Sequence, residues 1–201
     1  MFYKFNEEME NRLNSDCNYN DMFKLYSILM SSDIEKSIND NLSFLINLIP
    51  EIQYMIGFLH KHPHHHLDVW EHTLYALSLS FSDFDLRLAL LLHDIGKTFS
   101  FTEENGIRHF NNHPYVSSKM SKTILTRLGF KNKYIDKICY LIRFHDSFIT
   151  KKDIDKNYDL SLMRYYMQEC DALAHHPDKL EKRKKYLENT KKLLLKKMIL
   201  V

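Results

Sequence analysis

Apolar residues recur at helical spacing along most of this chain. The pattern is clearest on two faces of the first 58 residues: Met22, Leu25, Tyr26 and Leu29 on one, and Leu42, Leu45, Ile46 and Ile49 on the other. Pro50 suits the first turn of a short helix that follows. We interpret residues 1 to about 58 as an N-terminal helical cap.

The pattern changes between residues 60 and 66, where histidines surround Pro63 without a periodic apolar face. This stretch predicts a loop, because a proline disfavours helix just before it. Asp68 is an N-cap candidate for the next helix. The run from 86 to 95 is apolar enough for a central buried helix that has His93 and Asp94 in its last turn and Gly96 at its end.

Residues 98 to 112 predict a loop or a short hairpin. The remaining segments predict helices over about 114–128, 133–145, 159–174 and 178–199. The chain has only four glycines and four prolines, which disfavours turn-rich β architectures. We therefore expect an all-α fold in one domain, with the cap over 1–58, a central part over 59–176 and a basic C-terminal helix over 177–201.

The composition indicates the number of domains and the cellular location, but it says little about the function. A length of 201 residues, 44% of them hydrophobic, suits one sizeable core. The three cysteines are widely spaced and form no CxxC pair, so we expect neither disulfides nor a thiolate zinc site, and a cytoplasmic location. Neither a leader-like N-terminus nor a membrane-length apolar run is evident, so no membrane association is expected. A net charge of +2 does not by itself imply a polyanionic partner.

Two short motifs carry the candidate chemistry. One is Asp68-Val69-Trp70-Glu71-His72-Thr73, and the other is His93-Asp94-Ile95-Gly96-Lys97. Imidazole and carboxylate groups with a cation nearby suit a divalent metal that hydrolyses a phosphate ester. Spacing alone does not bring the motifs together, because they lie on separate predicted elements.

The order of these residues, His, then His-Asp, then a distant Asp, resembles the HD superfamily of metal-dependent phosphohydrolases over roughly residues 60–176. The strings 68–74, 87–97 and 109–113 look most like the HD domain that follows the catalytic part of some bacterial tRNA nucleotidyltransferases. The resemblance implies an all-α HD-domain helical bundle. It also implies one or two divalent ions, among which Mn, Fe, Zn, Mg and Ni are not distinguished.

The resemblance also implies metal ligands. The first metal would be held by His72, His93, Asp94 and Asp171. In the binuclear branch Asp94 bridges two metals, and His113 and His145 are the best matches for the second site. The alternatives are a mononuclear site with ordinary surface histidines at these two positions, and His109 as a second-site ligand or a substrate contact.

Other residues are assigned to the substrate. Lys97 is expected to neutralise charge on the phosphate. Lys97 and Asp94 are the two predicted catalytic residues. In the family, a lysine at this position favours the phosphodiesterase-like branch. The resemblance makes His66 a candidate for contact with the substrate phosphate, because a histidine recurs several residues before the Asp-Val-x-x-His string in the similar HD domains. We expect the other histidines between 60 and 65 to be exposed. Asp146 is interpreted as a helix-end residue.

The function expected from these residues is a phosphohydrolase. It would cleave a phosphomonoester or phosphodiester of a nucleotide or RNA end, and the resemblance points to 2',3'-cyclic phosphate or 2'-phosphate chemistry. The branch that cleaves cyclic dinucleotides is disfavoured, because its Gly-Tyr-Pro signature is missing. Two alternatives stay open: a non-catalytic, metal-retaining module that binds nucleotide or RNA, and a helical assembly protein in which the metal only stabilises the fold.

Nine basic residues lie between Lys179 and Lys197. Such a helix could follow the phosphates of a nucleic acid, although no DNA specificity is evident. The favoured interpretation is a solvated helix that docks onto the core through Leu180, Leu187, Leu194 and Met198. The sequence does not indicate an oligomeric state.

Overall fold

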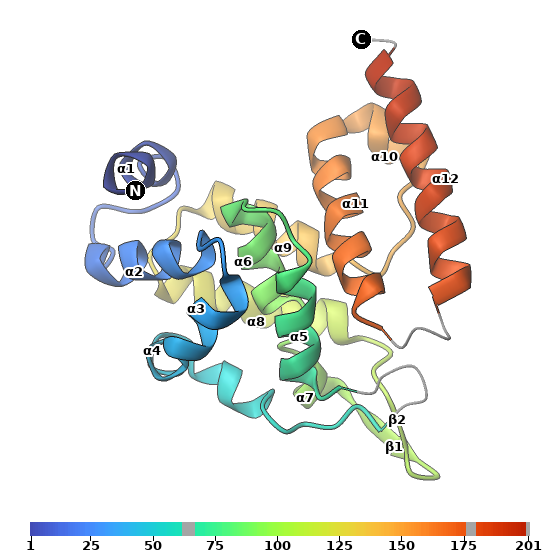
Figure 1. The fold of residues 1–201 in the computed structure, drawn as a ribbon, viewed down its shortest axis with the longest axis horizontal. Helices are drawn as coiled ribbons and strands as arrows, with labels where there is room; N and C mark the ends of the chain where they lie inside the picture. The colour runs from blue at the N-terminus through green and yellow to red at the C-terminus, as the bar shows by residue number, and fades with distance from the viewer. Residues whose placement is uncertain (62–66, 176–179, 200–201) are drawn as a thin grey trace.

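The computed structural model describes residues 1–61, 67–175 and 180–199. Helices make up most of this part, and one two-stranded hairpin projects from it (Figure 1). The predicted all-α fold is therefore confirmed. Within the described residues no helix is both long and apolar enough to cross a membrane.

The N-terminal region consists of short helices. They are α1 (Phe2–Met9), α2 (Tyr19–Leu29), α3 (Ile34–Asp40), α4 (Leu42–Leu48) and the 3-10 helix η1 (Pro50–Tyr54). Side chains cap two of them, since Asn18 accepts the backbone N–H of Asp21 and Asp33 accepts that of Lys36. The first predicted apolar face is entirely buried, and α2 and α3 contact the central helices that follow.

The centre of the molecule is α6 (Phe84–Leu92), in which every residue is buried. Four helices contact it: α2, α5 (Val69–Ser78), α9 (Asn132–Arg143) and α11 (Tyr158–Leu173). Asp68 begins α5 with the predicted N-cap, in a capping box with Glu71. Arg87 of α6 is also buried, and its guanidinium donates to the carbonyls of Leu29 and Ser31, which joins α6 to the end of α2.

Gly96 does not end a helix, contrary to the prediction. Helix α6 stops at Leu92, a turn follows, and Gly96 has a φ of −84° directly before α7 (Lys97–Ser100). A Cβ atom on Gly96 would lie 2.4 Å from the backbone N of Ser117 in α8 (His113–Arg127). The glycine is therefore required for the close approach of α8, and His93 and Asp94 lie in the turn instead of the helix.

The predicted hairpin is present within residues 98 to 112. Strands β1 (Thr102–Glu104) and β2 (Ile107–His109) are antiparallel, with Glu103 opposite Arg108. Positive φ angles at Asn105 and Gly106 form the turn between them.

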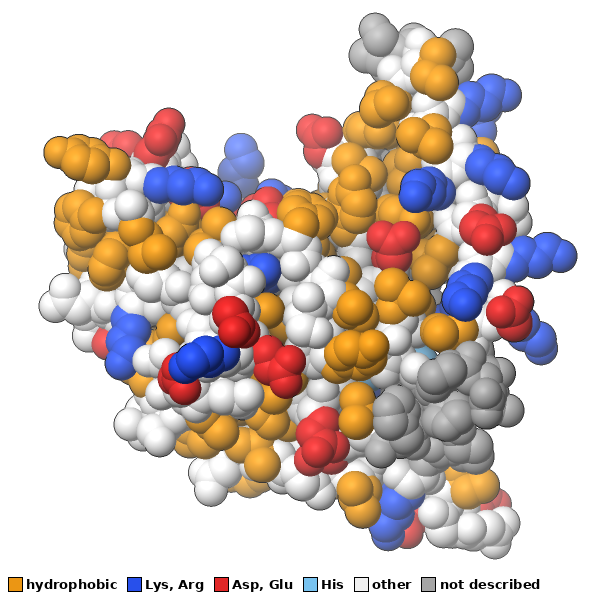
Figure 2. All heavy atoms as spheres, in the orientation of Figure 1, with side chains coloured by type: hydrophobic (Ala, Val, Ile, Leu, Met, Phe, Trp, Pro, Cys, Tyr) orange, Lys and Arg blue, Asp and Glu red, His pale blue; other side chains and the backbone are white. Residues whose placement is uncertain are grey.

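The C-terminal helix α12 (Leu180–Ile199) packs against α11 and α10 (Lys151–Lys156). Its buried residues include Leu180, Leu187 and Leu194, whereas most of its basic side chains are exposed along the outer edge that Figure 2 shows. The predicted contact of Met198 with the core is wrong, because this side chain is 57% exposed near the end of the helix. The sequence also gave no separate prediction for α10.

Candidate metal centre

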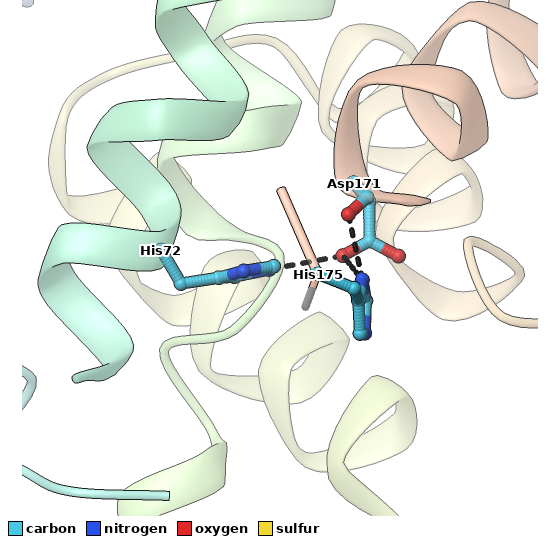
Figure 3. A group of neighbouring side chains, drawn as sticks. All are labelled: His72, Asp171 and His175. Atoms are coloured by element: carbon cyan, nitrogen blue, oxygen red, sulfur yellow. Dashed lines mark hydrogen bonds and ion pairs between the residues drawn. The ribbon is translucent and has the colours of Figure 1, made fainter. Parts of the chain in front are cut away.

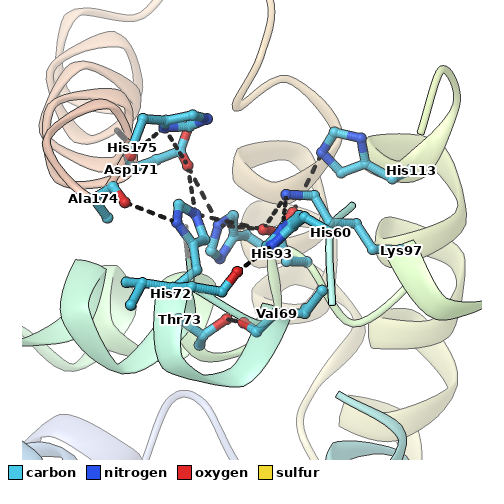
Figure 4. A network of polar contacts seen from close by, with 12 residues as sticks. His60, Val69, His72, Thr73, His93, Lys97, His113, Asp171, Ala174 and His175 are labelled. Carbon is cyan, nitrogen blue, oxygen red and sulfur yellow. Dashed lines mark hydrogen bonds and ion pairs between the residues drawn. The ribbon is translucent and has the colours of Figure 1, made fainter. Parts of the chain in front are cut away.

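The six predicted metal ligands converge from five parts of the fold. They are His72 on α5, His93 and Asp94 in the turn after α6, His113 at the start of α8, His145 in the turn after α9 and Asp171 on α11. All six side chains are buried, and Figure 4 shows several of them facing a common centre. Helix packing thus provides the convergence that spacing could not establish.

Asp94 stands between two groups of ligand atoms. Its Oδ2 lies 3.2 Å from His93 Nε2 and 3.5 Å from His72 Nε2, while its Oδ1 lies 3.3 Å from His113 Nε2. In each group, His72–His93–Asp94 and Asp94–His113–His145, the ligand atoms lie within 4.8 Å of one another. This geometry suits one carboxylate shared by two neighbouring cation positions.

Asp171 completes the first group. Its Oδ1 is 3.0 Å from His72 Nε2 and 3.7 Å from His93 Nε2. The other oxygen, Oδ2, accepts a hydrogen bond from Arg183 at 2.8 Å. The carboxylate therefore directs a single oxygen at the two histidines.

Backbone carbonyls determine which nitrogen of each histidine is available. The Nδ1 atoms of His93, His113 and His145 lie 2.7, 2.8 and 2.7 Å from the carbonyls of Leu90, Phe110 and Ile142. A carbonyl can only accept, so Nδ1 carries a proton and Nε2 is the nitrogen that faces the centre, where a neutral ring would offer its lone pair to a cation. The Nε2 atoms of His113 and His145 are 3.2 Å apart, an arrangement that a cation between them relieves.

Unsatisfied polar atoms mark the same point. His93 Nε2 and both carboxylate oxygens of Asp94 are buried without a hydrogen-bond partner among the described residues. Lys97 Nζ lies 2.7 Å from Asp94 Oδ2 as an ion pair that does not meet the geometry of a hydrogen bond. Because buried polar groups are ordinarily paired, these orphaned atoms fit a metal as their partner.

The electrostatics of the site favour positive charge at its centre. Burial disfavours a charged His93, but the carboxylates of Asp94 and Asp171 outweigh it and raise the pKa of His93 to about 10. Burial and the nearby charge of Lys97 lower the pKa of His113 to about 4, although Asp94 opposes them. A bound cation would displace the Nε2 proton of His93, and the neutral imidazoles beside ionised carboxylates would then form a nitrogen and oxygen donor set that suits borderline and hard divalent ions.

Lys97 is held by a residue that the sequence analysis misplaced. His60 was expected to be exposed, but it is fully buried, and its Nε2 lies 3.1 Å from Lys97 Nζ. Its Nδ1 donates to the carbonyl of Leu67, and burial together with the charge of Lys97 lowers the pKa of His60 to about 2. The pairing of Leu59 with Asp68 in an isolated bridge carries His60 into the interior.

Two further residues that the sequence analysis missed, His175 and Arg183, adjoin the candidate ligands. His175 follows Asp171 by one helical turn and shares a candidate ligand group with Asp171 and His72 (Figure 3). The second nitrogen of Arg183 donates to Asp146 at 2.6 Å, so one guanidinium joins Asp171 to Asp146. The i, i+4 spacing could have indicated His175, whereas Arg183 is recruited only by the return of α12 along α11.

His109 is not part of the ligand groups found among the described residues. His109 lies on β2 and lines the cavity at the metal centre. His66 lies outside the described residues, as do His62, His64, His65 and Lys179.

A cavity of about 660 Å³ opens onto the second ligand group. Basic side chains gather around it: Lys97, Arg108, Arg143, Lys182 and Arg183. His113, His145 and Asp171 also line it, so the candidate ligands face a basic cavity large enough for a small phosphorylated molecule.

Comparison with known proteins agrees with this geometry. The family model of the HD domain matches residues 64–197. The chain belongs to the HD domain family. This assignment confirms the resemblance inferred from the motifs and places the chain in a superfamily of metal-dependent hydrolases.

Two curated relatives are tRNA nucleotidyltransferases. The A-adding enzyme of Deinococcus radiodurans is 34% identical over 131 residues, which cover 61% of this chain and 30% of that protein. The CC-adding enzyme of Thermus thermophilus is 34% identical over 104 residues, which cover 48% of this chain and 24% of that protein. The matched part thus spans less than a third of each relative.

Proposed function

We propose that this HD domain is a metal-dependent phosphohydrolase that cleaves a phosphomonoester or phosphodiester of a nucleotide or RNA end. The observation that carries the proposal is that converging imidazole and carboxylate groups line a basic cavity. Both curated relatives are named as enzymes that add nucleotides to tRNA, which supports a nucleotide or RNA end as the substrate.

The first metal would be held by His72, His93, Asp94 and Asp171, and the second by Asp94, His113 and His145. A bound divalent cation supplies a Lewis acid that acidifies water and polarises a phosphoryl oxygen. The fixed Nδ1 hydrogen bonds orient the histidines before binding, so little reorganisation is needed.

Cationic side chains would then hold the substrate. Lys97 lines the cavity beside Asp94, where its ammonium can neutralise charge that develops on the phosphate. Arg108 and Arg143 bring guanidinium groups to the same cavity, and a guanidinium matches the oxygens of a phosphate in a forked hydrogen bond. His109 of β2 is proposed as a further substrate contact.

Turnover of simple esters tests the proposal. Freshly purified protein would be assayed with bis-p-nitrophenyl phosphate, p-nitrophenyl phosphate and 2',3'-cyclic nucleotides in each of several divalent metals. We expect hydrolysis in at least one metal, and its loss in Asp94→Asn. Asp40→Asn is the matched control, because Asp40 is an exposed residue at the end of α3.

A negative result would have a clear meaning. If the protein retains metal but hydrolyses none of these esters, the phosphohydrolase proposal fails. Salt-sensitive binding of RNA without turnover would instead support the non-catalytic module.

A further inference from the structure

A second, smaller cavity adjoins the metal centre. It has a volume of about 280 Å³ and lies between α11, α12 and the turn after α9. Four residues line both cavities: His145, Asp146, Lys182 and Arg183. A molecule whose phosphate lies at the metal centre would therefore extend its next group into this space.

Part of the lining of the second cavity is apolar and aromatic. Ala172 and Leu187 are buried residues of its lining, and Tyr186 and Phe148 add two rings. The Phe148 side chain is 75% exposed, and its ring meets that of Tyr186 edge to face with centroids 4.9 Å apart. An aromatic ring this exposed, beside a basic cavity, is a surface that a flat ligand ring can cover.

Hydrogen bonds hold this lining in place. The Tyr186 hydroxyl donates to Gln168 Oε1 at 2.9 Å and accepts the backbone N–H of Ile149 at 2.8 Å. Gln168 Nε2 in turn donates to the carbonyl of Ser147 at 2.7 Å. Because these polar groups are already paired within the protein, the cavity offers a preformed apolar wall. It does not offer these groups as hydrogen-bond partners for a ligand.

We propose that this cavity is the subsite for the base of the nucleotide whose phosphate is bound at the metal centre. The inference rests on the proposed function and names its substrate class as an ester that carries a nucleobase. A base is flat and has an apolar face, and stacking on aromatic side chains tolerates any base. The basic residues Lys182 and Arg183, which line both cavities, lie where the sugar-phosphate would connect the two.

The test compares two ligands that share a phosphorylated ribose and differ in the base. Adenosine 5'-monophosphate and ribose 5-phosphate would be titrated against the full chain by equilibrium dialysis, with analysis of the intact ester. We expect the nucleotide to bind about tenfold more tightly than ribose 5-phosphate, and this ratio to fall to about one in Phe148→Ala. The change Phe148→Tyr keeps a ring and should restore the ratio.

The matched control is Phe2→Ala, which removes an exposed phenylalanine on α1. Equal binding of the two ligands by the wild-type chain, or an unchanged ratio in Phe148→Ala, would overturn the subsite. The experiment measures binding, so a base-dependent affinity would support the subsite even if no ester were hydrolysed. Hydrolysis without base dependence would leave the proposed function intact and reject the subsite.

Discussion

At the scale of single residues, the two ring nitrogens of each histidine at the candidate metal centre have different partners. Each proposed histidine ligand has its Nδ1 hydrogen-bonded to a backbone carbonyl: His72 to Ala174, His93 to Leu90, His113 to Phe110 and His145 to Ile142. The Nε2 atoms then face the carboxylates and one another: His72 Nε2 pairs with Asp171 Oδ1, and the Nε2 atoms of His113 and His145 lie 3.2 Å apart. This arrangement would let one cation contact several ring nitrogens.

Lys97 is proposed to act on phosphate and not on the metal. The change Lys97→Met removes the charge and preserves most of the length of the side chain. We expect elemental analysis to give unchanged metal content, while kcat falls by about 10² to 10³ through loss of electrostatic stabilisation. Lys36→Met is the control, since Lys36 is exposed and pairs only with Asp40 among the described residues. A variant without metal would refute the assignment.

The variant His113→Ala tests whether the protein binds one or two metals per chain. His113 belongs to the second ligand group only, where it faces Asp94 and His145. In His113→Ala we expect elemental analysis to give half the metal per chain found in the wild type, because the first group stays complete. The same ratio in both proteins would establish a mononuclear site and return His113 to a structural role.

Arg183 is proposed as a positioning residue for Asp171. Its guanidinium fixes Oδ2 of Asp171, which leaves Oδ1 for the histidines. In Arg183→Gln we expect metal affinity to fall about 10- to 100-fold in competition with a chelating dye. Loss of a positive charge alone would strengthen cation binding, so weaker binding reports the loss of orientation. The control Lys185→Gln changes an exposed charge on the same helix, and tighter binding in Arg183→Gln would contradict the proposed role.

At the scale of elements, the contact of α7 and α8 depends on Gly96. A methyl group there would overlap the backbone of Ser117, and backbone cannot rotate away as a side chain can. We expect Gly96→Ala to lower the free energy of unfolding by about 1 to 3 kcal/mol in urea titrations. Ser117→Ala is the control, because it removes the hydroxyl that accepts the Gly96 N–H and leaves the close approach intact. A smaller loss in Gly96→Ala than in the control would show that α8 can move aside.

Periodicity predicted the long helices well. Segments 114–128, 133–145 and 159–174 correspond to α8, α9 and α11 within two residues at each end. It failed for α10, whose six residues bury only Ile154 and therefore carry almost no pattern. Gly96 was misjudged for a related reason, since its constraint comes from a helix some twenty residues later.

The candidate metal ligands were predicted from short motifs and the family resemblance, whereas the residues that surround them were not predicted. His60 sits in a histidine-rich stretch that offers no apolar pattern, and an isolated bridge at Leu59 carries it inside. Arg183 looked like one of many lysines and arginines on a solvated helix. Only the packing of α12 on α11 distinguishes it from its exposed neighbours.

At the scale of the whole molecule, one centre joins helices that are distant in sequence. The candidate ligands come from α5, the turn after α6, the start of α8, the turn after α9, and α11, while α12 adds Arg183. A metal bound there would stabilise the assembled fold, because the unfolded chain cannot present these groups together. The candidate site therefore lies between the main hydrophobic core and a second, smaller hydrophobic cluster that includes Ile149, Leu187 and Leu194.

Removal of metal should therefore weaken the entire fold. A cation at about 100 times its dissociation constant contributes about 2.7 kcal/mol. For a chain of this length that corresponds to a fall in Tm on the order of 5 to 10 °C after chelation. The Tm of the wild type and of Asp94→Asn would be measured by calorimetry with and without chelator. A variant that cannot bind metal should keep the same Tm when chelator is added. An equal fall in both would assign the effect to the chelator, and no fall in the wild type would show that the helices hold the ligands together without a cation.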